Sequence, residues 1–505
     1  MSFHEDRLRT LAPETLKGMR RGIEKESLRV RSDGALSQAP HPPALGSPLT
    51  HPHITTDFSE AQLELITGVH DSVDACLQEL TRIHQVVYRH IGEEILWCAS
   101  MPCNLPADNQ IPIGRYGTSN VGRAKTVYRL GLAHRYGRRM QAISGIHYNW
   151  SLPGVTDAQY FALIRNFRRH SWLPIYLFGA SPAVCASFVE GRKHHLVELS
   201  PGTMYAPHAT SLRMGPLGYQ SDAQSALYVS YNDLESYSAS LDEALTKPYP
   251  PYAKVGIRDD DNYRQLSTSL LQIENEFYGS IRPKRRISSG ERALHALRSR
   301  GVEYVEVRLM DLDPFCPIGI WPATCRLLDV FLLHCLLAES PPDTPQEIAA
   351  VRRNQQRVAL RGREPGLKLD RDAKQVGLAE WGGEILAECA PVAAALDRAH
   401  GGGSAHRDAL AAAPGALRAP ATVPSAKVLD AMARSHQNSF VRFALAESTR
   451  HKAYLKSLEL PREVLARFKG LADWSLERQR EIEAADSVPF EAWRQKYLSH
   501  DNLVV

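Results

Sequence analysis

Three short segments of the chain alternate apolar residues with carboxylate, imidazole, amide or guanidinium side chains. They span residues 22–30, 144–152 and 301–310, and each otherwise has the composition of a β-strand. Residues i and i+2 of a strand lie on the same face of a sheet. The polar side chains that would share a face are Glu24 with Glu26, His147 with Asn149, and Glu306 with Arg308. A sheet built from these strands has an apolar face and a charged floor, which suits metal ions and a phosphorylated or carboxylated substrate.

The length and composition of the chain are those of an ordinary globular protein. Its 505 residues are 43% hydrophobic and 23% charged, and the formal net charge is +4. This charge is too small for a dedicated nucleic-acid-binding protein. The N-terminus lacks the basic and then apolar order of a signal peptide, and no run of about 18 apolar residues predicts a membrane span. We therefore expect a cytoplasmic protein without a membrane partner.

The eight cysteines do not form a recognisable ligand or disulfide pattern. They lie at positions 76, 98, 103, 185, 316, 325, 335 and 389. No two have Cys-x-x-Cys spacing, and none has a histidine at zinc-finger spacing. The spacing therefore argues against a disulfide framework and against a zinc module, and it favours a reducing compartment.

The distribution of predicted elements indicates an α+β fold, which we interpret as one domain over residues 1–505. Residues 1–330 mix strand-like runs with helices, and residues 323–505 consist mainly of helix formers. The helices predicted in this second part span residues 324–338, 344–360, 377–398, 425–446 and 463–485. The glycine-rich stretch at 401–405 and the Ala/Pro-rich run at 411–425 are typical of exposed connections. No Gly-x-Gly-x-x-Gly turn supports a Rossmann fold, and the segregation of strands from helices favours α+β.

Residues 54–66 carry a further group of carboxylates. The β-branched run is followed by Asp57, and Glu60 lies three residues later, which is the spacing of a capping box at the start of a helix. In such a helix Glu64 would lie two turns beyond Asp57, on the same side. A capping role explains Asp57 and Glu60 but not Glu64, so a ligand site and an exposed helix surface are equal alternatives here.

Three basic segments are candidates for binding anions. Residues 116–125 are rich in small residues and contain Arg123 and Lys125, but they lack the P-loop pattern. Backbone amides in such a loop can hold a phosphate, although an ordinary loop at the start of a helix is the simpler interpretation. The run at 281–286 is typical of a solvated turn, and Arg213 offers a guanidinium suited to a carboxylate. With the acidic floor, these residues indicate Mg²⁺ or Mn²⁺ together with nucleotide phosphates.

Several long motifs follow one another in a fixed order along the chain. They are GIEKESLR at 22–29, ITTDFSE at 54–60, YGTSNVGR at 116–123, ISGIHYNWSL at 143–152, TSLRM at 210–214, QIENEFY at 272–278, IRPKR at 281–285, YVEVR at 304–308 and, more weakly, AADSVPFEAW at 484–493. These motifs closely resemble those of the proteobacterial glutamate–cysteine ligase family, and they cover nearly the whole chain. The resemblance implies that ATP, L-glutamate and L-cysteine give γ-glutamylcysteine, ADP and phosphate, the first step of glutathione biosynthesis. It also implies a glutamine-synthetase-like fold, in which a curved antiparallel sheet surrounds the active site and helices lie outside.

The same resemblance implies roles for individual residues. The metal ligands, for Mg²⁺ or Mn²⁺, would be Glu24, Glu26, Asp57, Glu64, His147 and Glu306. The nucleotide contacts that we expect are Ile146, Asn149, Arg123 and Lys125. Arg213 and Arg308 would bind glutamate or the transferred phosphoryl group and, with Glu306, would be catalytic. The wall of the cysteine pocket would consist of Phe58, Tyr128, Leu132, Tyr219 and Tyr278.

Two alternatives to this function stay open at this point. A related carboxylate–amine ligase would share the acidic floor and differ only in the pocket that admits the amine. A basic nucleic-acid-binding protein would use the 281–286 run and nearby tyrosines, but it gives no reason for the alternating carboxylates. A bifunctional glutathione-forming enzyme is disfavoured, because the helical C-terminal third leaves no room for a second ATP-binding domain. We expect a monomer that has no nucleic-acid partner.

Overall fold

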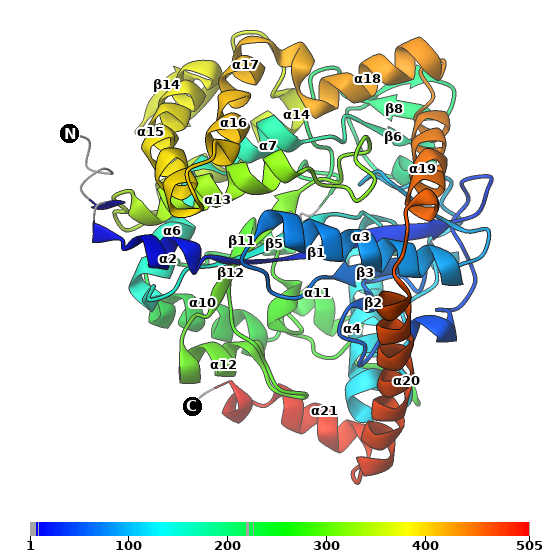
Figure 1. Cartoon of the computed structure of the whole chain (residues 1–505). Coiled ribbons are helices and arrows are strands. Elements are labelled where there is room, and N and C mark those ends of the chain that lie inside the picture. The colour runs from blue at the N-terminus through cyan, green and yellow to red at the C-terminus, as the bar shows by residue number, and fades with distance from the viewer. Residues whose placement is uncertain (1–6, 9, 219–221, 226, 504–505) are drawn as a thin grey trace.

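A seven-stranded antiparallel sheet forms the centre of the structure (Figure 1). The computed structural model describes residues 7–8, 10–218, 222–225 and 227–503. The strands of the sheet are β1 (Arg20–Val30), β2 (Ile54–Thr56), β3 (Gln62–Ile66), β4 (Ile95–Leu96), β5 (Ile146–Ser151), β11 (Ile281–Lys284) and β12 (Tyr304–Met310). Their order is β11-β12-β5-β1-β3-β2, and β4 pairs with β1. The three segments with alternating polar residues are therefore the adjacent strands β1, β5 and β12, which confirms that prediction.

The two faces of the sheet differ because the side chains of each strand alternate. Ile23, Tyr148 and Val305 point into the main hydrophobic core. The helices that contribute to the same core beside the sheet are α3 (Val73–His90), α6 (Asp157–His170), α7 (Trp172–Phe178) and α13 (Pro322–Leu337). This burial fixes the register, since a slip by one residue would turn the carboxylates into the core.

The remaining elements of the first part surround the sheet. Its other helices are α2 (Pro13–Lys17), α4 (Asn120–Tyr136), α5 (Arg138–Gln141), α8 (Ala186–Val189), α9 (Asp222–Ser225), α10 (Leu234–Thr246), α11 (Pro250–Ala253) and α12 (Ala293–Arg300). Its smaller strands are β6 (Ala183–Cys185), β7 (Val197–Ser200) and β8 (Thr203–Tyr205), which form a three-stranded sheet, and the pair β9 (Arg258–Asp259) and β10 (Asn262–Tyr263). Helices and antiparallel strands thus occur together, in agreement with the α+β prediction.

The C-terminal part is mainly helical, as predicted, but two details differ. After α13 it contains α14 (Pro345–Arg361), the hairpin β13 (Lys368–Arg371) and β14 (Lys374–Gly377), α15 (Leu378–Ala399), α16 (Ala405–Ala411), α17 (Ala413–Arg418), α18 (Pro424–Ser435), α19 (Phe440–Ser457), α20 (Arg462–Ala485) and α21 (Phe490–Leu498). The single helix predicted at 425–446 is two helices, because Gln437 and Asn438 adopt φ values of 53° and 59° between them. The run predicted as exposed at 411–425 includes helical turns, since Leu417 is buried in the core.

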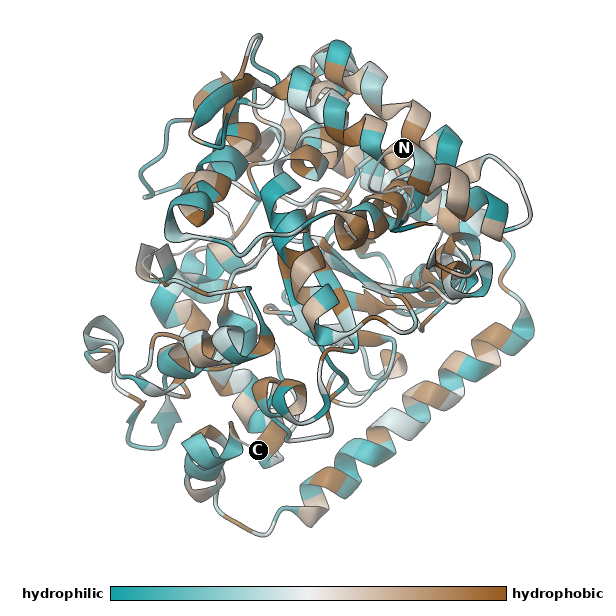
Figure 2. Cartoon of the chain, turned by 90° about the vertical axis from the view of Figure 1, so that its left-hand side faces the viewer, coloured by the Kyte–Doolittle hydropathy of each residue, from teal (hydrophilic) through white to brown (hydrophobic). Residues whose placement is uncertain are grey.

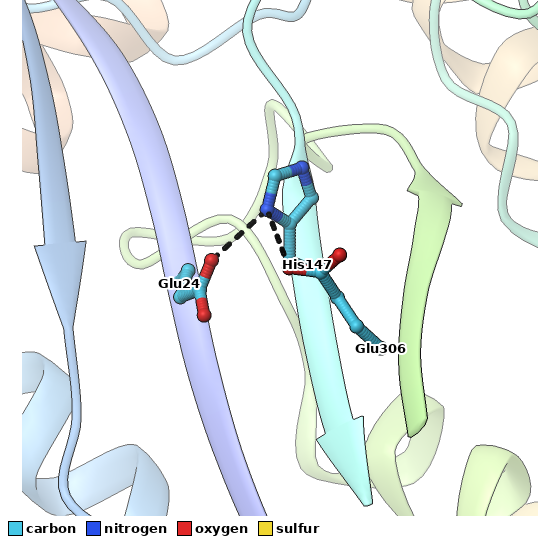
Figure 3. Close-up of side chains that lie close together, drawn as sticks. All are labelled: Glu24, His147 and Glu306. Atoms are coloured by element: carbon cyan, nitrogen blue, oxygen red, sulfur yellow. Dashed lines mark hydrogen bonds and ion pairs between the residues drawn. The ribbon is translucent and has the colours of Figure 1, made fainter. Parts of the chain in front are cut away.

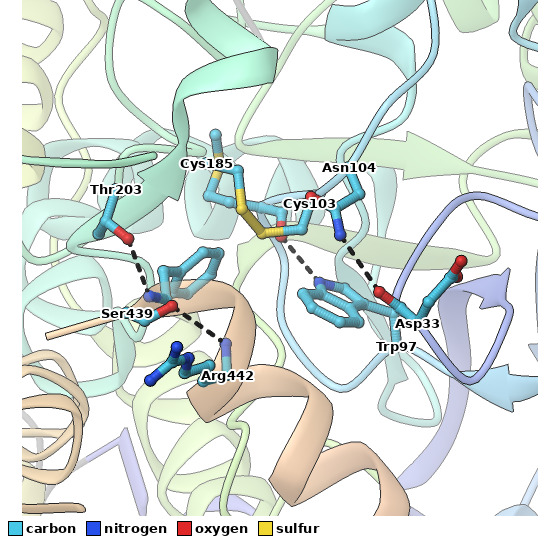
Figure 4. The surroundings of a disulfide bond; sticks show 10 residues. Asp33, Trp97, Cys103, Asn104, Cys185, Thr203, Ser439 and Arg442 are labelled. Carbon is cyan, nitrogen blue, oxygen red and sulfur yellow. Dashed lines mark hydrogen bonds between the residues drawn. A yellow bond between two sulfur atoms is a disulfide. The ribbon is translucent and has the colours of Figure 1, made fainter. Parts of the chain in front are cut away.

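A disulfide joins Cys103 to Cys185 and links two segments that lie 82 positions apart (Figure 4). Trp97 packs in the same region, where its indole N–H donates to the carbonyl of Met101 at 2.9 Å. The other six cysteines are free and buried. The prediction against disulfides is wrong for this pair, because spacing along a chain does not reveal which distant cysteines meet.

Polar and apolar residues are interspersed along the outer helices (Figure 2). An amphipathic helix of this kind places its apolar stripe against the core and its polar stripe outward. Within the described residues, every helix is either too short or too polar to cross a membrane.

Candidate active site

Three side chains from neighbouring strands meet on the charged face of the sheet (Figure 3). His147 Nδ1 lies 3.1 Å from Glu24 Oε2 and 3.8 Å from Glu306 Oε1. The register explains this meeting, because Glu24 lies opposite His147 and Glu306 lies opposite Asn149 on β5. Asn149 Nδ2 donates to Glu24 Oε1 at 3.0 Å. One ligand atom from each of the three residues in Figure 3 lies within 4.8 Å of the others, which is close enough for them to share an ion.

Glu26 and Glu64 extend the acidic group along the floor. They lie directly opposite each other on β1 and β3. Glu26 Oε1 is 3.7 Å from His147 Nε2, and Glu26 Oε2 accepts a hydrogen bond from the backbone N–H of Gly145 at 2.7 Å. The side chains that together line one cavity of about 800 Å³ include Glu24, Glu26, Asp57, Glu64, His147 and Glu306. The structure therefore brings together all of the metal ligands that the resemblance implied.

Residues 54–56 and 62–66 form strands β2 and β3 with a turn between them, so the helix predicted there is wrong. Glu60 does not complete a capping box, because its carboxylate accepts a hydrogen bond from the backbone N–H of His41 at 2.9 Å. Glu64 alternates with buried leucines on both sides, which is the two-residue period of a strand. Pairing with β1 and β2 decided the local structure, and it also brought Glu64 to the floor.

The raised pKa values of carboxylates on the floor indicate that these groups cannot all ionise without added positive charge. Burial and the charge of Asp57 raise the pKa of Glu26 to about 8. Burial and the charge of Glu24 raise the pKa of Glu64 well above its usual value. Carboxylates behave in this way when they are crowded together and removed from water. A divalent cation among them would let all of them ionise.

His147 is suited to bind such a cation as a neutral imidazole. Burial and the charge of Arg308 lower the pKa of His147. Its Nε2 atom is buried and has no hydrogen-bond partner among the described residues. Carboxylate oxygens with one imidazole are a donor set for Mg²⁺ or Mn²⁺. The residues present therefore fit the metal that the sequence predicted.

A row of basic side chains accompanies the acidic floor. Lys284 Nζ lies 3.4 Å from Glu306 Oε1, and Arg308 Nη1 lies 3.0 Å from Glu306 Oε2. Although burial opposes ionisation, these two cations hold the pKa of Glu306 well below its usual value. Arg282 lines the same cavity. The solvated turn predicted for this run is wrong, because Ile281 is buried in the core and its neighbours pair with β12 as strand β11.

The other residues predicted to contact nucleotide lie in different surroundings. The loop before α4 is a helix entry, as predicted, with the Ser119 side chain capping the helix. Lys125 on this helix lines the cavity. Arg123 lies over the ring of Phe490, 4.4 Å from its centroid. The side chain of Ile146 is buried in the apolar core, on the opposite face of the sheet from the floor.

Arg213 lies beside the floor, next to Arg308. Its side chain is buried, and Nη2 donates to the backbone carbonyl of Arg308 at 2.8 Å. The guanidinium approaches Gly145 so closely that a Cβ there would lie 2.1 Å from it. Arg213 lines a second cavity of about 380 Å³, and this cavity shares Tyr278 and Arg308 with the larger one.

Most of the residues implied for the cysteine pocket share the main cavity with the acidic floor. The four that line it are Phe58, Tyr128, Leu132 and Tyr278. Gln141 Nε2 donates to the Tyr278 hydroxyl at 2.9 Å and fixes its position. The fifth, Tyr219, lies outside the residues that the structure describes.

The cavity also contains residues to which the sequence assigned no role, although Trp493 is the last residue of the 484–493 motif. Arg129 lies one helical turn beyond Lys125 and donates to the backbone carbonyl of Asp57. Its spacing from Lys125 is a usable signal, because residues i and i+4 of a helix are neighbours. Trp474 and Trp493 line the cavity from α20 and α21. No sequence pattern connects these distant helices to the sheet.

Comparison with known proteins identifies the family. The family model described as glutamate-cysteine ligase matches residues 8–358. The glutamate–cysteine ligase of Pseudomonas fluorescens (strain Pf0-1) is 49% identical over 94% of this chain and 92% of its own length. The glutamate–cysteine ligase of Alcanivorax borkumensis is 45% identical over 99% of this chain and 100% of its own length.

Solved structures agree with the sequence relatives. The crystal structure of glutamate–cysteine ligase from Francisella tularensis in complex with AMP has a TM-score of 0.90 at 36% identity, covering 95% of this chain and 97% of that chain. A bifunctional glutathione synthetase from Pasteurella multocida shares the fold, with a TM-score of 0.71 at 24% identity over 93% of this chain and 57% of that chain. The chain therefore belongs to the glutamate–cysteine ligase family.

Proposed function

We propose that the main cavity is the site at which the enzyme uses ATP to join the γ-carboxylate of L-glutamate to the amine of L-cysteine. The observation that carries this proposal is that the acidic floor, its basic row and the aromatic pocket line one cavity. Both the γ-carboxylate and the phosphates of ATP are negatively charged, so their approach requires fixed positive charge. The products are γ-glutamylcysteine, ADP and phosphate, in the first step of glutathione biosynthesis.

The acidic floor would hold Mg²⁺ or Mn²⁺. The ligands that we propose are Glu24, Glu26, Asp57, Glu64, His147 and Glu306. When bound, the metal would neutralise charge on the phosphate oxygens of ATP. Asn149 orients Glu24 by donating to its carboxylate, as outer hydrogen bonds commonly do for metal ligands.

The basic residues of the chain act on the transferred phosphoryl group and on glutamate. Arg308 and Lys284 both lie within 3.4 Å of Glu306, at the edge of the floor. From there their N–H groups can donate to phosphoryl oxygens as charge moves onto them. The γ-carboxylate attacks the γ-phosphate of ATP, which gives γ-glutamyl phosphate and releases ADP. Arg213, buried beside Arg308, is placed to bind a carboxylate of glutamate from the neighbouring cavity.

The aromatic pocket would position cysteine for the second step. Its amine attacks the carbonyl carbon of γ-glutamyl phosphate, and phosphate leaves. Phe58, Tyr128, Leu132 and Tyr278 form a small pocket for the thiol side chain, and Tyr219 completes the proposed set. Because the enzyme forms no covalent bond to substrate in this scheme, it needs no nucleophilic serine or cysteine.

Nucleotide binding is consistent with the comparisons, since the Francisella tularensis relative was crystallised with AMP. We propose that Lys125 contacts the phosphates from α4 and that Asn149 contacts nucleotide from the floor. The sheet would then be of the glutamine-synthetase type, with the reaction on its charged face.

We further propose that the chain acts as one catalytic domain and as a monomer. One hydrophobic core includes both Ile23 of the sheet and Leu396 of the helical part, which supports a single domain. We also propose a cytoplasmic location; six cysteines are free and buried, whereas the Cys103–Cys185 disulfide is the one feature among the described residues that argues against a reducing compartment. Sedimentation velocity and cell fractionation test these two points, and a stable dimer or an extracytoplasmic protein would contradict them.

The proposed function is tested by measuring phosphate and γ-glutamylcysteine while one substrate at a time is omitted. Phosphate release should require glutamate, and product should form only when cysteine is also present. A panel of small amino acids offered in place of cysteine distinguishes this reaction from that of a ligase with another acceptor. Faster turnover with a different amine would assign the pocket to that amine.

A further inference from the structure

Tyr278, the tyrosine that lines both cavities, is held in place by groups behind the cysteine pocket. Its backbone N–H donates to Gln224 Oε1 at 3.0 Å. The ring of Tyr136 lies edge-on against the ring of Tyr278, with centroids 5.8 Å apart and an interplanar angle of 66°. Because Gln141 donates to the hydroxyl, the backbone, ring and hydroxyl of Tyr278 each have a separate support.

The buried residue Glu276 connects two of these supports. Its Oε1 atom accepts hydrogen bonds from the Tyr136 hydroxyl at 2.7 Å and from Arg135 Nη1 at 2.9 Å. Its backbone carbonyl accepts from Gln224 Nε2 at 2.8 Å, and the same amide group donates to the Tyr136 hydroxyl oxygen at 3.2 Å. Tyr136, Glu276 and Gln224 therefore form a closed ring of hydrogen bonds, which we call the triad.

The surroundings of the triad favour a single geometry. The side chains of Arg135 and Glu276 are fully buried in their ion pair, and Glu276 Oε2 accepts from the backbone N–H of Gln272 at 2.7 Å. Burial and the charge of Glu276 raise the pKa of the Tyr136 hydroxyl, so this group remains a donor. Breaking one contact would leave a buried polar group unsatisfied, which costs more than the contact itself contributes.

Tyr136 also continues the side of α4 that faces the cysteine pocket. Tyr128, Leu132 and Tyr136 lie four residues apart, on successive turns of this helix. The first two line the main cavity, whereas Tyr136 and Glu276 lie outside the lining of both cavities. All three residues of α4 pack in one hydrophobic cluster with Tyr278. Tyr136 can therefore affect the pocket only through the residues that it supports.

We propose that Tyr136 is a positioning residue that fixes Tyr278 and thereby makes the enzyme select cysteine as its amine substrate. The triad holds the hydroxyl of Tyr136, and the ring of Tyr136 in turn supports the ring of Tyr278. This inference rests on the proposed function, because it takes the pocket as the site of cysteine. Amines that differ by one small group are distinguished only by contacts with a well-defined wall.

The test compares Tyr136→Phe and Tyr136→Leu with the wild-type enzyme and with Tyr263→Phe. The phenylalanine variant removes only the hydroxyl, and the leucine variant also removes the ring contact. Tyr263 is a matched control, because its hydroxyl donates to another glutamate, Glu491, at 2.8 Å and lies outside the lining of both cavities. Steady-state assays give the KM for each substrate. They also give kcat/KM for L-serine and L-2-aminobutyrate, which replace the thiol by a hydroxyl or a methyl group.

We expect the KM for cysteine to rise roughly tenfold in Tyr136→Phe and further in Tyr136→Leu, since misplacing a positioned group can cost up to about 100-fold. The preference for cysteine over 2-aminobutyrate should fall in the same order. The KM values for glutamate and ATP should not change, and Tyr263→Phe should match the wild-type enzyme. If Tyr136→Leu fails to fold, Tyr136→Phe alone decides the question.

Three outcomes in Tyr136→Phe would each overturn the inference while leaving the proposed function intact. They are a wild-type KM for cysteine, an unchanged preference over 2-aminobutyrate, and an equal rise in all three KM values, as a general loss of stability would produce. Failure of the proposed function would look different, because the wild-type enzyme itself would then not form γ-glutamylcysteine.

Discussion

Glu26 on β1 and Glu64 on β3 lie directly opposite each other in the central sheet. Like charges in that arrangement destabilise a sheet by about 0.2–1 kcal/mol. Burial, together with the charge of Asp57 for Glu26 and of Glu24 for Glu64, raises the pKa of both residues. A folded protein that keeps such a pair gives up some stability for a place where a cation can bind.

Replacing Glu64 by Gln should therefore separate stability from metal binding. The variant keeps the shape of the side chain and removes the repulsion, so in EDTA its free energy of unfolding should rise by about 0.2–1 kcal/mol. Its affinity for Mn²⁺, measured by electron paramagnetic resonance without substrates, should fall at least tenfold. The exposed Glu463→Gln on α20 is the control and should change neither quantity. Unchanged Mn²⁺ affinity in Glu64→Gln would remove Glu64 from the ligand set.

Lys284→Ala tests the basic row. Removing a cation that faces the transferred phosphoryl group should lower kcat at least tenfold, because the developing charge loses a fixed partner. Lys247 is a suitable control, since it is exposed on the surface beside Glu243 and lies outside the cavity. Measured phosphate release should be normal in Lys247→Ala. A normal kcat in Lys284→Ala with saturating ATP would show that Arg308 acts without it.

Tyr128→Ala tests the cysteine pocket. Loss of one apolar contact in a small pocket is worth about 1–3 kcal/mol, so the KM for cysteine should rise roughly tenfold. The KM for glutamate should change much less, because Arg213 and Arg308 bind that substrate. Tyr454→Ala, at an exposed position on α19, is the control. Equal effects on both KM values would argue that Tyr128 supports the cavity as a whole.

His51 should make folding stability depend on pH. Burial and the charge of His53 lower the pKa of His51 to about 4. In the folded protein its Nδ1 accepts hydrogen bonds from the backbone N–H groups of His53 and Ile54 at 3.1 and 2.9 Å. The unfolded chain protonates His51 near pH 6.5, so the stabilisation is complete above that pH and is lost as the pH falls toward 4.

The expected loss of stability from this one residue is about 2 kcal/mol between pH 7 and pH 5. Urea unfolding of the wild-type protein and of His51→Asn at both pH values measures it. The asparagine carbonyl can still accept from the backbone but does not titrate, so the variant should lose less stability over this interval. An identical loss in both proteins would show that His51 is not responsible.

The alternating pattern of three segments is enough to predict the centre of the fold and of the site. The sequences of β1, β5 and β12 alternate polar and apolar residues, and in the structure the apolar face of each strand is buried. The alternation alone therefore places Glu24, His147 and Glu306 on polar strand faces. Which strands are neighbours depends on long-range pairing, and the resemblance to a family supplied that information.

The predictions failed where a local pattern competed with tertiary structure. Asp57 and Glu60 have the spacing of a helix cap, but pairing with β1 made the following residues a strand. Lys284 belongs to a basic run that is typical of a turn, yet pairing with β12 makes that run a strand. Trp474 lines the main cavity only because the distant helix α20 packs beside that cavity. No motif in the sequence of α20 can predict this packing.

The most direct test of the account compares Glu306→Gln with Glu303→Gln in the Mg²⁺- and glutamate-dependent release of phosphate from ATP. Glu306 is buried between His147, Lys284 and Arg308, whereas Glu303 pairs with Arg286 just before the same strand. We predict that Glu306→Gln keeps the circular dichroism spectrum of the wild-type enzyme but releases phosphate at least 100-fold more slowly. Glu303→Gln should retain activity. Wild-type turnover by Glu306→Gln at saturating Mg²⁺ would contradict the central claim that this floor holds the metal for the reaction.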